Sequence, residues 1–252
     1  MVNLDFTNER LIPGMHEVSL FKEHEDRYNF VTPFVKGKSV VDIACGIGMG
    51  TQLLRDAGAT QVIGVDKDAS ALDYAREEYQ DCIFVKSDAQ HLPLDNSSAD
   101  IIVSFETIEH LEDPARFLKE CKRVLKSGGL FICSTPNRSV NSWWGSNPYH
   151  LREFLPEEFL QLAGSFFVDL EVYGQRRVLY PAFVGRRVIS GLLEKVHLKT
   201  SVARLMARKP PAISLDKRYT LDRRRASNEI QPYAKSWLVK PSYLLVTARN
   251  AE

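Results

Sequence analysis

The stretch VVDIACGIGMGT, residues 40–51, decides the fold of this chain. Its apolar run predicts a buried strand that ends at Asp42 and runs through Gly46, Gly48 and Gly50 into a helix. Glycines at such a junction let the backbone approach a ligand closely, and open α/β sheets bind their ligands at the carboxyl ends of the strands. The stretch therefore predicts a ligand site where the first strand ends.

Around this stretch, short apolar runs alternate with helical patterns from Ser39 to Pro136. The best-defined helix follows Asp113, which can cap it, and Gly128 is expected to end it. Strands that alternate with helices predict an α/β fold with a parallel sheet. The runs and patterns are, in order, SVVDIA, TQLLRDAG, QVIGVD, ASALDYAREEY, CIFVKSD, ADIIVSFE, DPARFLKECKRVLKSGG and LFICSTP.

The composition is that of an ordinary soluble globular protein. The 252 residues are 44% hydrophobic and 26% charged, and the formal net charge of +1 marks no particular class of partner. The four cysteines form no CxxC pair, which favours a reducing compartment. Because neither a signal-peptide pattern nor a long apolar stretch is present, we expect a cytoplasmic protein without a transmembrane segment; peripheral membrane contact stays open.

The chain is expected to form a single domain over residues 1–252. We expect an N-terminal helical cover over residues 1–38 and a cofactor-binding core over residues 39–137. Residues 138–252 then form the substrate-side half, with a basic helical insertion at about residues 176–236 between the last two strands.

Two segments of the substrate-side half could contact an acceptor. Residues 186–225 hold twelve lysines and arginines against three acidic residues, which suits an acidic small molecule, an RNA or an anionic membrane surface, or else a solvated face. Trp143, Trp144 and Tyr149 could stack on a sugar, a flat ring or a nucleobase, or pack as a hydrophobic lid.

An acidic residue marks the end of the second strand. Asp66 ends VIGVD about twenty residues after the glycine-rich stretch, where its carboxylate can accept hydrogen bonds from ribose hydroxyls. This arrangement alone fits a nicotinamide dinucleotide as well as S-adenosylmethionine (SAM). Three later motifs discriminate between the two cofactors: KSDAQHLPL at residues 86–94, ADIIVSFETIEHLEDP at residues 99–114 and LKSGG at residues 125–129.

With these motifs in this order, residues 38–137 resemble the class I SAM-dependent methyltransferase family, of the type 11 kind. The resemblance implies a Rossmann-like fold whose seven-stranded, mostly parallel sheet has an antiparallel last strand and helices on both faces. It also implies SAM as the cofactor. The implied contacts are Asp42, Ala44, Gly46 and Gly48 for the methionine part, Asp66 for the ribose, Asp88 and Ala89 for the adenine, and Phe105 beside the sulfonium.

The N-terminal segment is similar to a bacterial subgroup associated with cell-surface glycan biosynthesis. The similarity rests on FTNERLIPG at residues 6–14 and on residues 23–46. In such proteins this segment folds over the cofactor, which implies that Arg27 and Tyr28 approach the SAM carboxylate; a surface position for Arg27 is the alternative.

The residues assigned to catalysis are His110, His150 and Glu106. In ETIEHLEDP, Glu106, Glu109 and His110 are spaced to share one helical face, and His150 could return to the same mouth. Three interpretations stay open. A histidine is a general base for an acceptor hydroxyl; the four residues bind a divalent cation; or Glu109 and His110 only support the structure.

The metal interpretation has a resemblance of its own, to metal-dependent small-RNA end methyltransferases and some quinone-biosynthesis O-methyltransferases, but no residue is assigned as a metal ligand. The sequence as a whole predicts a SAM-dependent methyltransferase that methylates an oxygen of a small molecule or of a cell-surface glycan or nucleotide-sugar intermediate. A metal-dependent RNA methyltransferase and a non-catalytic SAM-binding scaffold are the alternatives.

Overall fold

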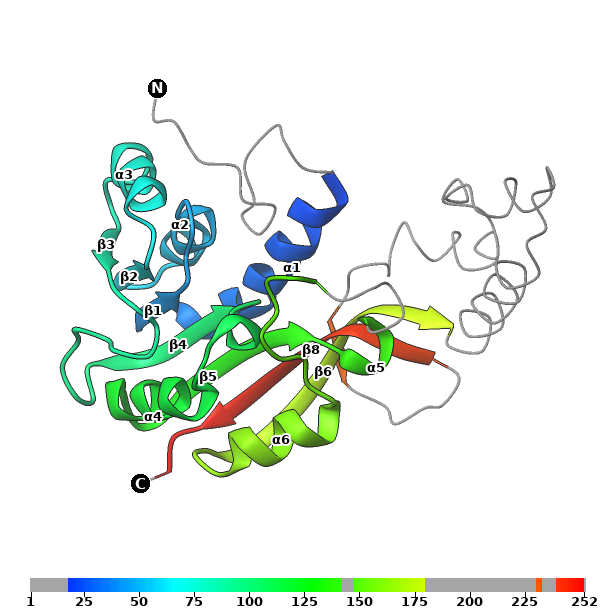
Figure 1. The fold of residues 1–252 in the computed structure, drawn as a ribbon. Helices are drawn as coiled ribbons and strands as arrows, with labels where there is room; N and C mark the ends of the chain where they lie inside the picture. The colour runs from blue at the N-terminus through cyan, green and yellow to red at the C-terminus, as the bar shows by residue number, and fades with distance from the viewer. Residues whose placement is uncertain (1–17, 142–146, 180–229, 233–238, 252) are drawn as a thin grey trace, which may run out of the picture.

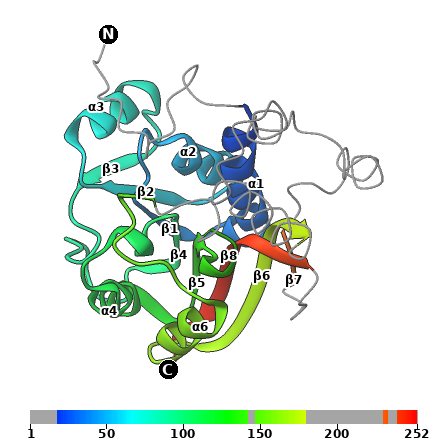
Figure 2. The same ribbon diagram turned by 45° about the vertical axis from the view of Figure 1, so that its right-hand side comes forward.

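The computed structural model describes residues 18–141, 147–179, 230–232 and 239–251 of the chain. Their strands form one sheet in the order β3-β2-β1-β4-β5-β8-β6-β7 (Figures 1 and 2). The strands are β1 Ser39–Ile43, β2 Gln61–Asp66, β3 Ile83–Lys86, β4 Ala99–Phe105, β5 Leu125–Pro136, β6 Val168–Leu179, β7 Gln231–Pro232 and β8 Val239–Arg249.

Strands β1 to β5 pair in parallel, whereas β8 runs antiparallel to both of its neighbours, β5 and β6. This confirms the Rossmann-like class I methyltransferase fold that the sequence predicts, a mostly parallel sheet with an antiparallel last strand. The sheet has one strand more than the predicted seven. The additional strand is the two-residue β7, which pairs with β6 at the edge. Strand β6 continues to Leu179, so the first residues of the expected basic insertion belong to the sheet; residues 180–229, which hold nearly all of that insertion, lie outside the described part.

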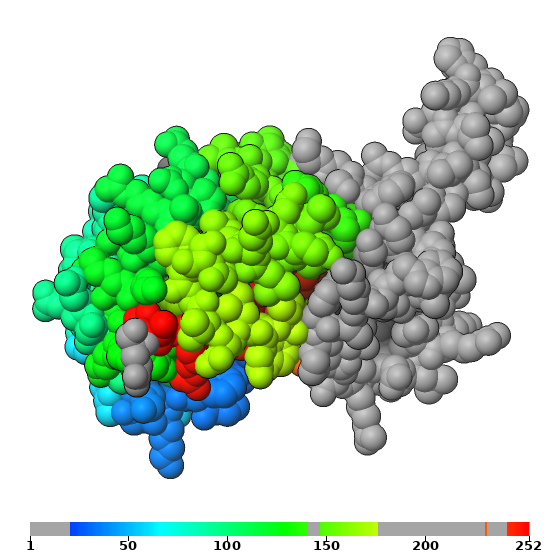
Figure 3. Space-filling model, turned by 90° about the horizontal axis from the view of Figure 1, so that it is seen from below, coloured from blue at the N-terminus to red at the C-terminus, as the bar shows by residue number. Residues whose placement is uncertain are grey.

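Helices cover both faces of the sheet. Helices α1, α2 and α3 lie on one face, and α4 and α6 lie on the other (Figures 1 and 2). Seen from below, residues of the α6 region cover the middle of that face, and only small patches of the C-terminal strand reach the surface (Figure 3). The helical elements are α1 Val18–Val35, α2 Met49–Asp56, α3 Ala69–Glu78, the 3-10 helix η1 Ile108–His110, α4 Pro114–Val124, α5 Arg138–Asn141 and α6 Pro156–Gly164. Among the described residues, no helix has both the length and the apolar content that crossing a bilayer requires.

Helix α4 forms for the reasons that its sequence suggests, but it ends earlier than expected. Asp113 caps it by accepting the backbone N–H of Arg116 at 2.9 Å, and Pro114 occupies the first turn. The expected end at Gly128 is wrong because Leu125 already pairs with Ala99 as the start of β5. The chain therefore enters β5 at the point where its apolar pattern would allow one more helical turn.

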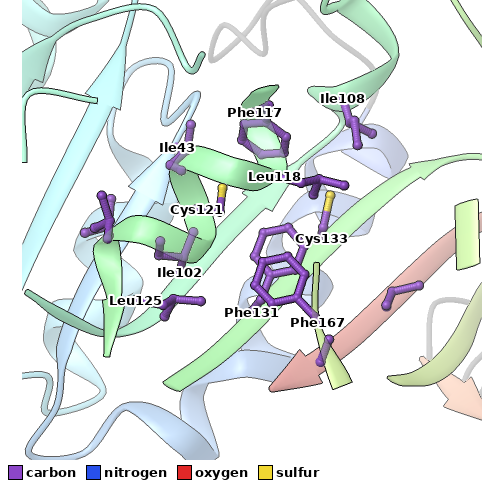
Figure 4. Packing of buried hydrophobic residues seen from close by; sticks show 14 of the residues in the cluster. Ile43, Ile102, Ile108, Phe117, Leu118, Cys121, Leu125, Phe131, Cys133 and Phe167 are labelled. Carbon is purple, nitrogen blue, oxygen red and sulfur yellow. The ribbon is translucent and has the colours of Figure 1, made fainter. Parts of the chain in front are cut away.

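The largest buried cluster lies between the sheet and helices α4 and α6. Phe131 of β5 stacks on Phe167 with ring centroids 4.6 Å apart, and Phe117 of α4 packs against Phe131 edge-on at 6.3 Å (Figure 4). All three side chains are almost fully buried. Burial of aromatic rings contributes several kcal/mol of stability, so this cluster gives the strand ends a rigid support.

Helix α1 lies in the segment where the sequence predicts an N-terminal cover. Tyr28, Val31 and Val35 are buried against the opposite face of the sheet, so the C-terminal half of the helix is held there. Phe34 is 43% exposed because it lies on the outer side of the helix, where it contacts Phe30. Residues 1–17 of the expected cover lie outside the described part.

Candidate functional site

A cavity of about 980 Å³ opens at the carboxyl ends of the parallel strands. Its walls include Ala44 after β1, Asp66 at the end of β2, Asp88 after β3 and Phe105 at the end of β4. Four successive parallel strands thus deliver one residue each to the same edge of the sheet, where open α/β folds place their ligands.

The glycine-rich stretch forms the part of this wall between β1 and α2. Gly46 and Gly48 have φ values of 56° and 83°, in the left-handed region that glycine adopts without strain. Ala44 also has a positive φ, of 61°, which costs a residue with a Cβ about 1 kcal/mol. A Cβ on Gly48 would lie 2.8 Å from the ring of Phe84, so this glycine is required by close packing as well as by its backbone.

Asp66 is held in a fixed orientation at the wall. Its Oδ2 accepts the backbone N–H of Gly46 at 2.8 Å, and its Oδ1 accepts that of Asp68 at 2.9 Å. The carboxylate thereby ties the glycine-rich loop to the end of β2. Each oxygen keeps a second lone pair, so the group can still accept two hydroxyl hydrogen bonds from a ligand.

Asp42 and Gly48, two of the residues expected to contact the cofactor, do not line the cavity. Asp42 is fully buried, and its carboxylate accepts the hydroxyls of Thr51 at 2.7 Å and Tyr28 at 3.1 Å. Burial raises the pKa of Asp42 to about 7, although both hydroxyls oppose the shift. The structure places Asp42 behind the loop, where it fixes α2 and α1 to the strand.

Asp88 and Ala89 line the cavity at the end of β3, as their assignment to the adenine requires. Asp88 Oδ1 accepts the backbone N–H of Gln90 at 2.7 Å, and this hydrogen bond lowers the pKa of Asp88. Asp88 therefore also closes the local turn, and Ala89 packs against the large buried cluster.

The residues that follow β4 do not form the helical face that the sequence predicts. Glu106 has a φ of 51°, and only residues 108–110 form the short helix η1, so Glu106, Glu109 and His110 do not share one helical face. Glu106 Oε1 accepts the hydroxyl of Ser134 at 2.7 Å, which fixes it across the β4–β5 boundary. Phe105 is buried edge-on against Tyr28, with ring centroids 5.0 Å apart.

Arg27 is neither on the surface nor in the cavity wall. It is 1% exposed, with Nη2 3.8 Å from Glu106 Oε1, and its Nε donates to Gln175 Oε1 at 2.9 Å. Its guanidinium lies over the ring of Tyr243, 4.4 Å from the centroid, in a cation–π contact. Gln175 and Tyr243 come from β6 and β8, and no local sequence signal links them to Arg27.

Three residues expected near the acceptor come together at the cavity. Glu109, His110 and His150 each place one donor atom within 4.8 Å of the others, and the two imidazole centroids are 4.9 Å apart. The expected return of His150 to the mouth of the site is therefore observed. Two contacts hold it there: Arg152 donates its backbone N–H to the Glu109 carbonyl at 3.1 Å, and His110 Nδ1 lies 3.0 Å from the Tyr149 carbonyl.

Hydrogen bonds indicate which ring nitrogen of each histidine carries a proton. A carbonyl oxygen only accepts, so His110 Nδ1 carries the proton in its contact with Tyr149, and in the neutral ring the lone pair lies on Nε2. His150 Nδ1 lies 3.0 Å from Glu153 Oε1, and its Nε2 lies 3.0 Å from Asn147 Nδ2. The sequence suggested only a stacking or packing role for the Tyr149 ring and gave no role to Glu153, because one acts on His110 through its backbone carbonyl and the other reaches His150 through loop geometry.

Glu109 is fully buried beside these rings. Its Oε2 accepts the hydroxyl of Thr135 at 2.9 Å, while Oε1 has no hydrogen-bond partner and lies 3.9 Å from His110 Nε2. Burial, followed by the charge of Glu106, raises the pKa of Glu109 well above its usual value. The cluster thus combines a buried carboxyl group with two oriented imidazoles, a set that can move a proton or hold a cation.

Comparison with known proteins agrees with this geometry. A family model described as a methyltransferase domain matches residues 41–133. A probable S-adenosylmethionine-dependent methyltransferase of Mycolicibacterium smegmatis is 39% identical over 172 residues, which are 67% of this chain and 66% of that protein. A ubiquinone biosynthesis O-methyltransferase of Idiomarina loihiensis is 37% identical over 116 residues, 42% of this chain and 46% of that protein. This chain thus spans slightly less than two thirds of the first relative and about half of the second.

Among solved structures, the YcgJ protein of Bacillus subtilis superposes with a TM-score of 0.60 at 18% identity, covering 91% of this chain and 100% of that one. This similarity concerns the fold alone. Together, the matched domain, the related sequences and the shared fold show that the chain belongs to the class I SAM-dependent methyltransferase family.

Proposed function

We propose that this protein transfers the methyl group of SAM to a hydroxyl oxygen of a small molecule or of a cell-surface glycan or nucleotide-sugar intermediate. The observation that carries the proposal is that one cavity holds both the oriented carboxylate of Asp66 and the cluster of Glu109, His110 and His150. The first suits a cofactor ribose, and the second suits an acceptor that must lose a proton.

The cofactor half follows the strand ends. The adenine would lie at Asp88 and Ala89, the ribose hydroxyls on Asp66, and the methionine part along Ala44 and Gly46, all of which line the cavity. Phe105 would lie beside the sulfonium. Asp42 and Gly48 would act from behind the wall by holding the loop in place.

The reaction is a direct displacement. The acceptor oxygen attacks the methyl carbon, the carbon–sulfur bond breaks, and its electron pair stays on sulfur to give S-adenosylhomocysteine. Much of the rate of such a step comes from alignment of the two reactants. The hydroxyl proton must also leave, and His110 or His150, which lie together at the cavity, would accept it.

Two observations support a small hydroxyl acceptor. The cavity volume of about 980 Å³ lies at the upper end of the usual range for ligand pockets, which suits a cofactor together with a small second substrate. A relative that carries the name ubiquinone biosynthesis O-methyltransferase is 37% identical to this chain over 116 residues. The described residues contain no feature that favours RNA over a small molecule; the basic segment expected to do so, residues 186–225, lies outside them.

The proposed compartment is the cytoplasm, which agrees with the unpaired state of the cysteine thiols. The four cysteines, Cys45, Cys82, Cys121 and Cys133, are all free, and three of them are buried. Free cysteines are typical of reducing compartments.

Methyl transfer from labelled SAM into a host extract tests the proposal. The extract is separated afterwards into RNA, lipid, and glycan or nucleotide-sugar pools, and the Asp66→Ala variant serves as the control that should transfer little label. Label in the glycan or small-molecule pool, stable to mild alkali as a methyl ether is, is the expected result. Label confined to RNA would favour the RNA alternative, and no transfer by a protein that still binds S-adenosylhomocysteine would indicate a non-catalytic scaffold.

A further inference from the structure

We propose that Gln90 is a positioning residue, which fixes Asp88 so that the cavity selects the amino-bearing ring of adenine over a 6-oxopurine. Gln90 lines the cavity in the segment after β3, next to Ala89, and its side chain reaches the start of helix α4. Both ends of its amide bond to the protein, so it acts on the cofactor through Asp88. The role rests on the proposed function, which puts the adenine at Asp88 and Ala89.

One backbone group fixes the orientation of the Gln90 amide. The backbone N–H of Asp113 donates to Gln90 Oε1 at 2.9 Å, and because an N–H group can only donate, the carbonyl end of the amide faces α4. The amino end faces Asp88, where Nε2 donates to Oδ1 at 3.2 Å. A flipped amide would set two donors against each other at Asp113 and two acceptors against each other at Asp88.

Asp88 receives two hydrogen bonds from Gln90 on the same oxygen. The backbone N–H of Gln90 donates to Asp88 Oδ1 at 2.7 Å, in addition to the bond from the side chain. Within the described part of the chain, no hydrogen bond reaches Oδ2. The carboxylate is therefore held by one oxygen and keeps the other for a ligand of the cavity that Asp88 lines.

A fixed carboxylate distinguishes an amino group from a carbonyl oxygen. The backbone hydrogen bond from Gln90 is the main cause that lowers the pKa of Asp88, so the group is ionised at neutral pH and only accepts hydrogen bonds. Oδ2 can accept the amino N–H of adenine, but it would face the lone pairs of the oxygen in a 6-oxopurine. A carboxylate free to turn could accept the N1–H of that 6-oxopurine instead, and the two bonds from Gln90 resist the turn.

Helix α4 gives Gln90 a rigid support. Asp113 caps this helix, whose buried face packs in the largest hydrophobic cluster. Arg116, one turn into the helix, donates from Nε to the Gln90 carbonyl at 3.2 Å, which is a second link between the two segments. Groups that bind a ligand are most precise when a regular element holds the residues behind them, and Asp88 meets this condition through Gln90.

Calorimetric titration with S-adenosylhomocysteine and with its 6-oxo analogue, S-inosylhomocysteine, tests the role. We expect the wild type to bind the adenosyl compound about tenfold more tightly. Gln90→Ala should reduce this ratio about threefold or more, because Asp88 can then turn toward the N1–H of the 6-oxopurine. Gln90→Glu keeps an acceptor for the Asp113 N–H but removes the donor to Asp88, so it should lower the ratio as well. Gln52→Ala is the matched control, because Gln52 donates to Asp56 at 2.7 Å but does not line the cavity, and its ratio should equal that of the wild type.

An unchanged ratio in both Gln90 variants would overturn the role, and so would equal affinity of the wild type for the two compounds. Equal losses of affinity for both compounds are the outcome for a purely structural residue and would overturn it too; urea denaturation shows that each variant is folded. An unchanged ratio in Asp88→Ala would put the adenine elsewhere, which refutes the role of Gln90 while the proposed methyl transfer stands. If the wild type does not bind S-adenosylhomocysteine at all, the proposed function itself fails.

Discussion

The hydroxyl of Tyr28 donates a hydrogen bond of 3.1 Å to Oδ1 of Asp42 and so joins helix α1 to the strand that carries the glycine-rich loop. Thr51, in the first turns of α2, donates to the other carboxylate oxygen at 2.7 Å. One buried carboxylate therefore connects three elements around the cofactor half of the cavity. Because the group is fully buried, its ionisation affects the stability of the whole arrangement.

Stability should therefore depend on pH through Asp42. Its pKa rises from 3.8 to about 7 in the folded protein, so the unfolded chain releases this proton first as the pH increases. The stability contributed by the protonated group is complete below about pH 4 and is lost by about pH 7. Replacing Asp42 with Asn removes the titration, so the variant should gain about 2 to 3 kcal/mol relative to the wild type between pH 5 and pH 8.

Urea denaturation of both proteins at the two pH values measures this change. The exposed Asp73, changed to Asn, provides the control, whose difference from the wild type should stay constant with pH. A constant difference for Asp42→Asn as well would show that the buried carboxyl group does not keep its proton.

Gly50 and Tyr28 should be energetically coupled. A Cβ on Gly50 would collide with the ring of Tyr28, so Gly50→Ala is expected to lower the free energy of unfolding by about 1 to 3 kcal/mol. The loss should be much smaller in a Tyr28→Ala background, which a double-mutant cycle of urea denaturation measures. Gly164→Ala is the matched control, because its Cβ would meet only Leu170 at 4.0 Å. Equal losses with and without the tyrosine ring would contradict this packing.

Removal of the His110 imidazole should separate catalysis from cofactor binding. His110→Ala is expected to lower kcat about 10²- to 10⁴-fold, since the hydroxyl proton then lacks its route out. The affinity for S-adenosylhomocysteine should change less than twofold, because no cofactor contact is assigned to this ring. Steady-state kinetics and calorimetry check the two values, with His91→Ala as the control. Undiminished turnover in both His110→Ala and His150→Ala would leave the cluster a structural role only.

The sequence predicts the sheet well because its signals are local. Each strand of the core is a short apolar run, and helix α4 shows its cap, its first-turn proline and its buried face within a dozen residues. Asp66 could be assigned for the same reason, since its position at the end of an apolar run places it at the ligand edge of the sheet.

Long-range contacts account for the differences. Asp42 is buried with the rest of its strand. The hydroxyls that donate hydrogen bonds to its carboxylate come from Tyr28 and Thr51, on two separate helices. Arg27 meets Gln175 across 148 positions of sequence, a contact that no motif announces. The positive φ of Glu106 arises where β4 ends against Ser134, so the spacing that suggested a helical face did not describe this turn.

Binding of SAM in the cavity is tested most directly by calorimetric titration with S-adenosylhomocysteine. We predict one molecule bound per chain, with affinity reduced about 10- to 100-fold in Asp66→Ala, because charge-assisted hydrogen bonds to the ribose would be lost along with the tie to Gly46. Asp73→Ala, an exposed aspartate on the neighbouring helix, should bind as the wild type does. No saturable binding by the wild type, or equal affinity in Asp66→Ala, would contradict the assignment of this cavity to the cofactor.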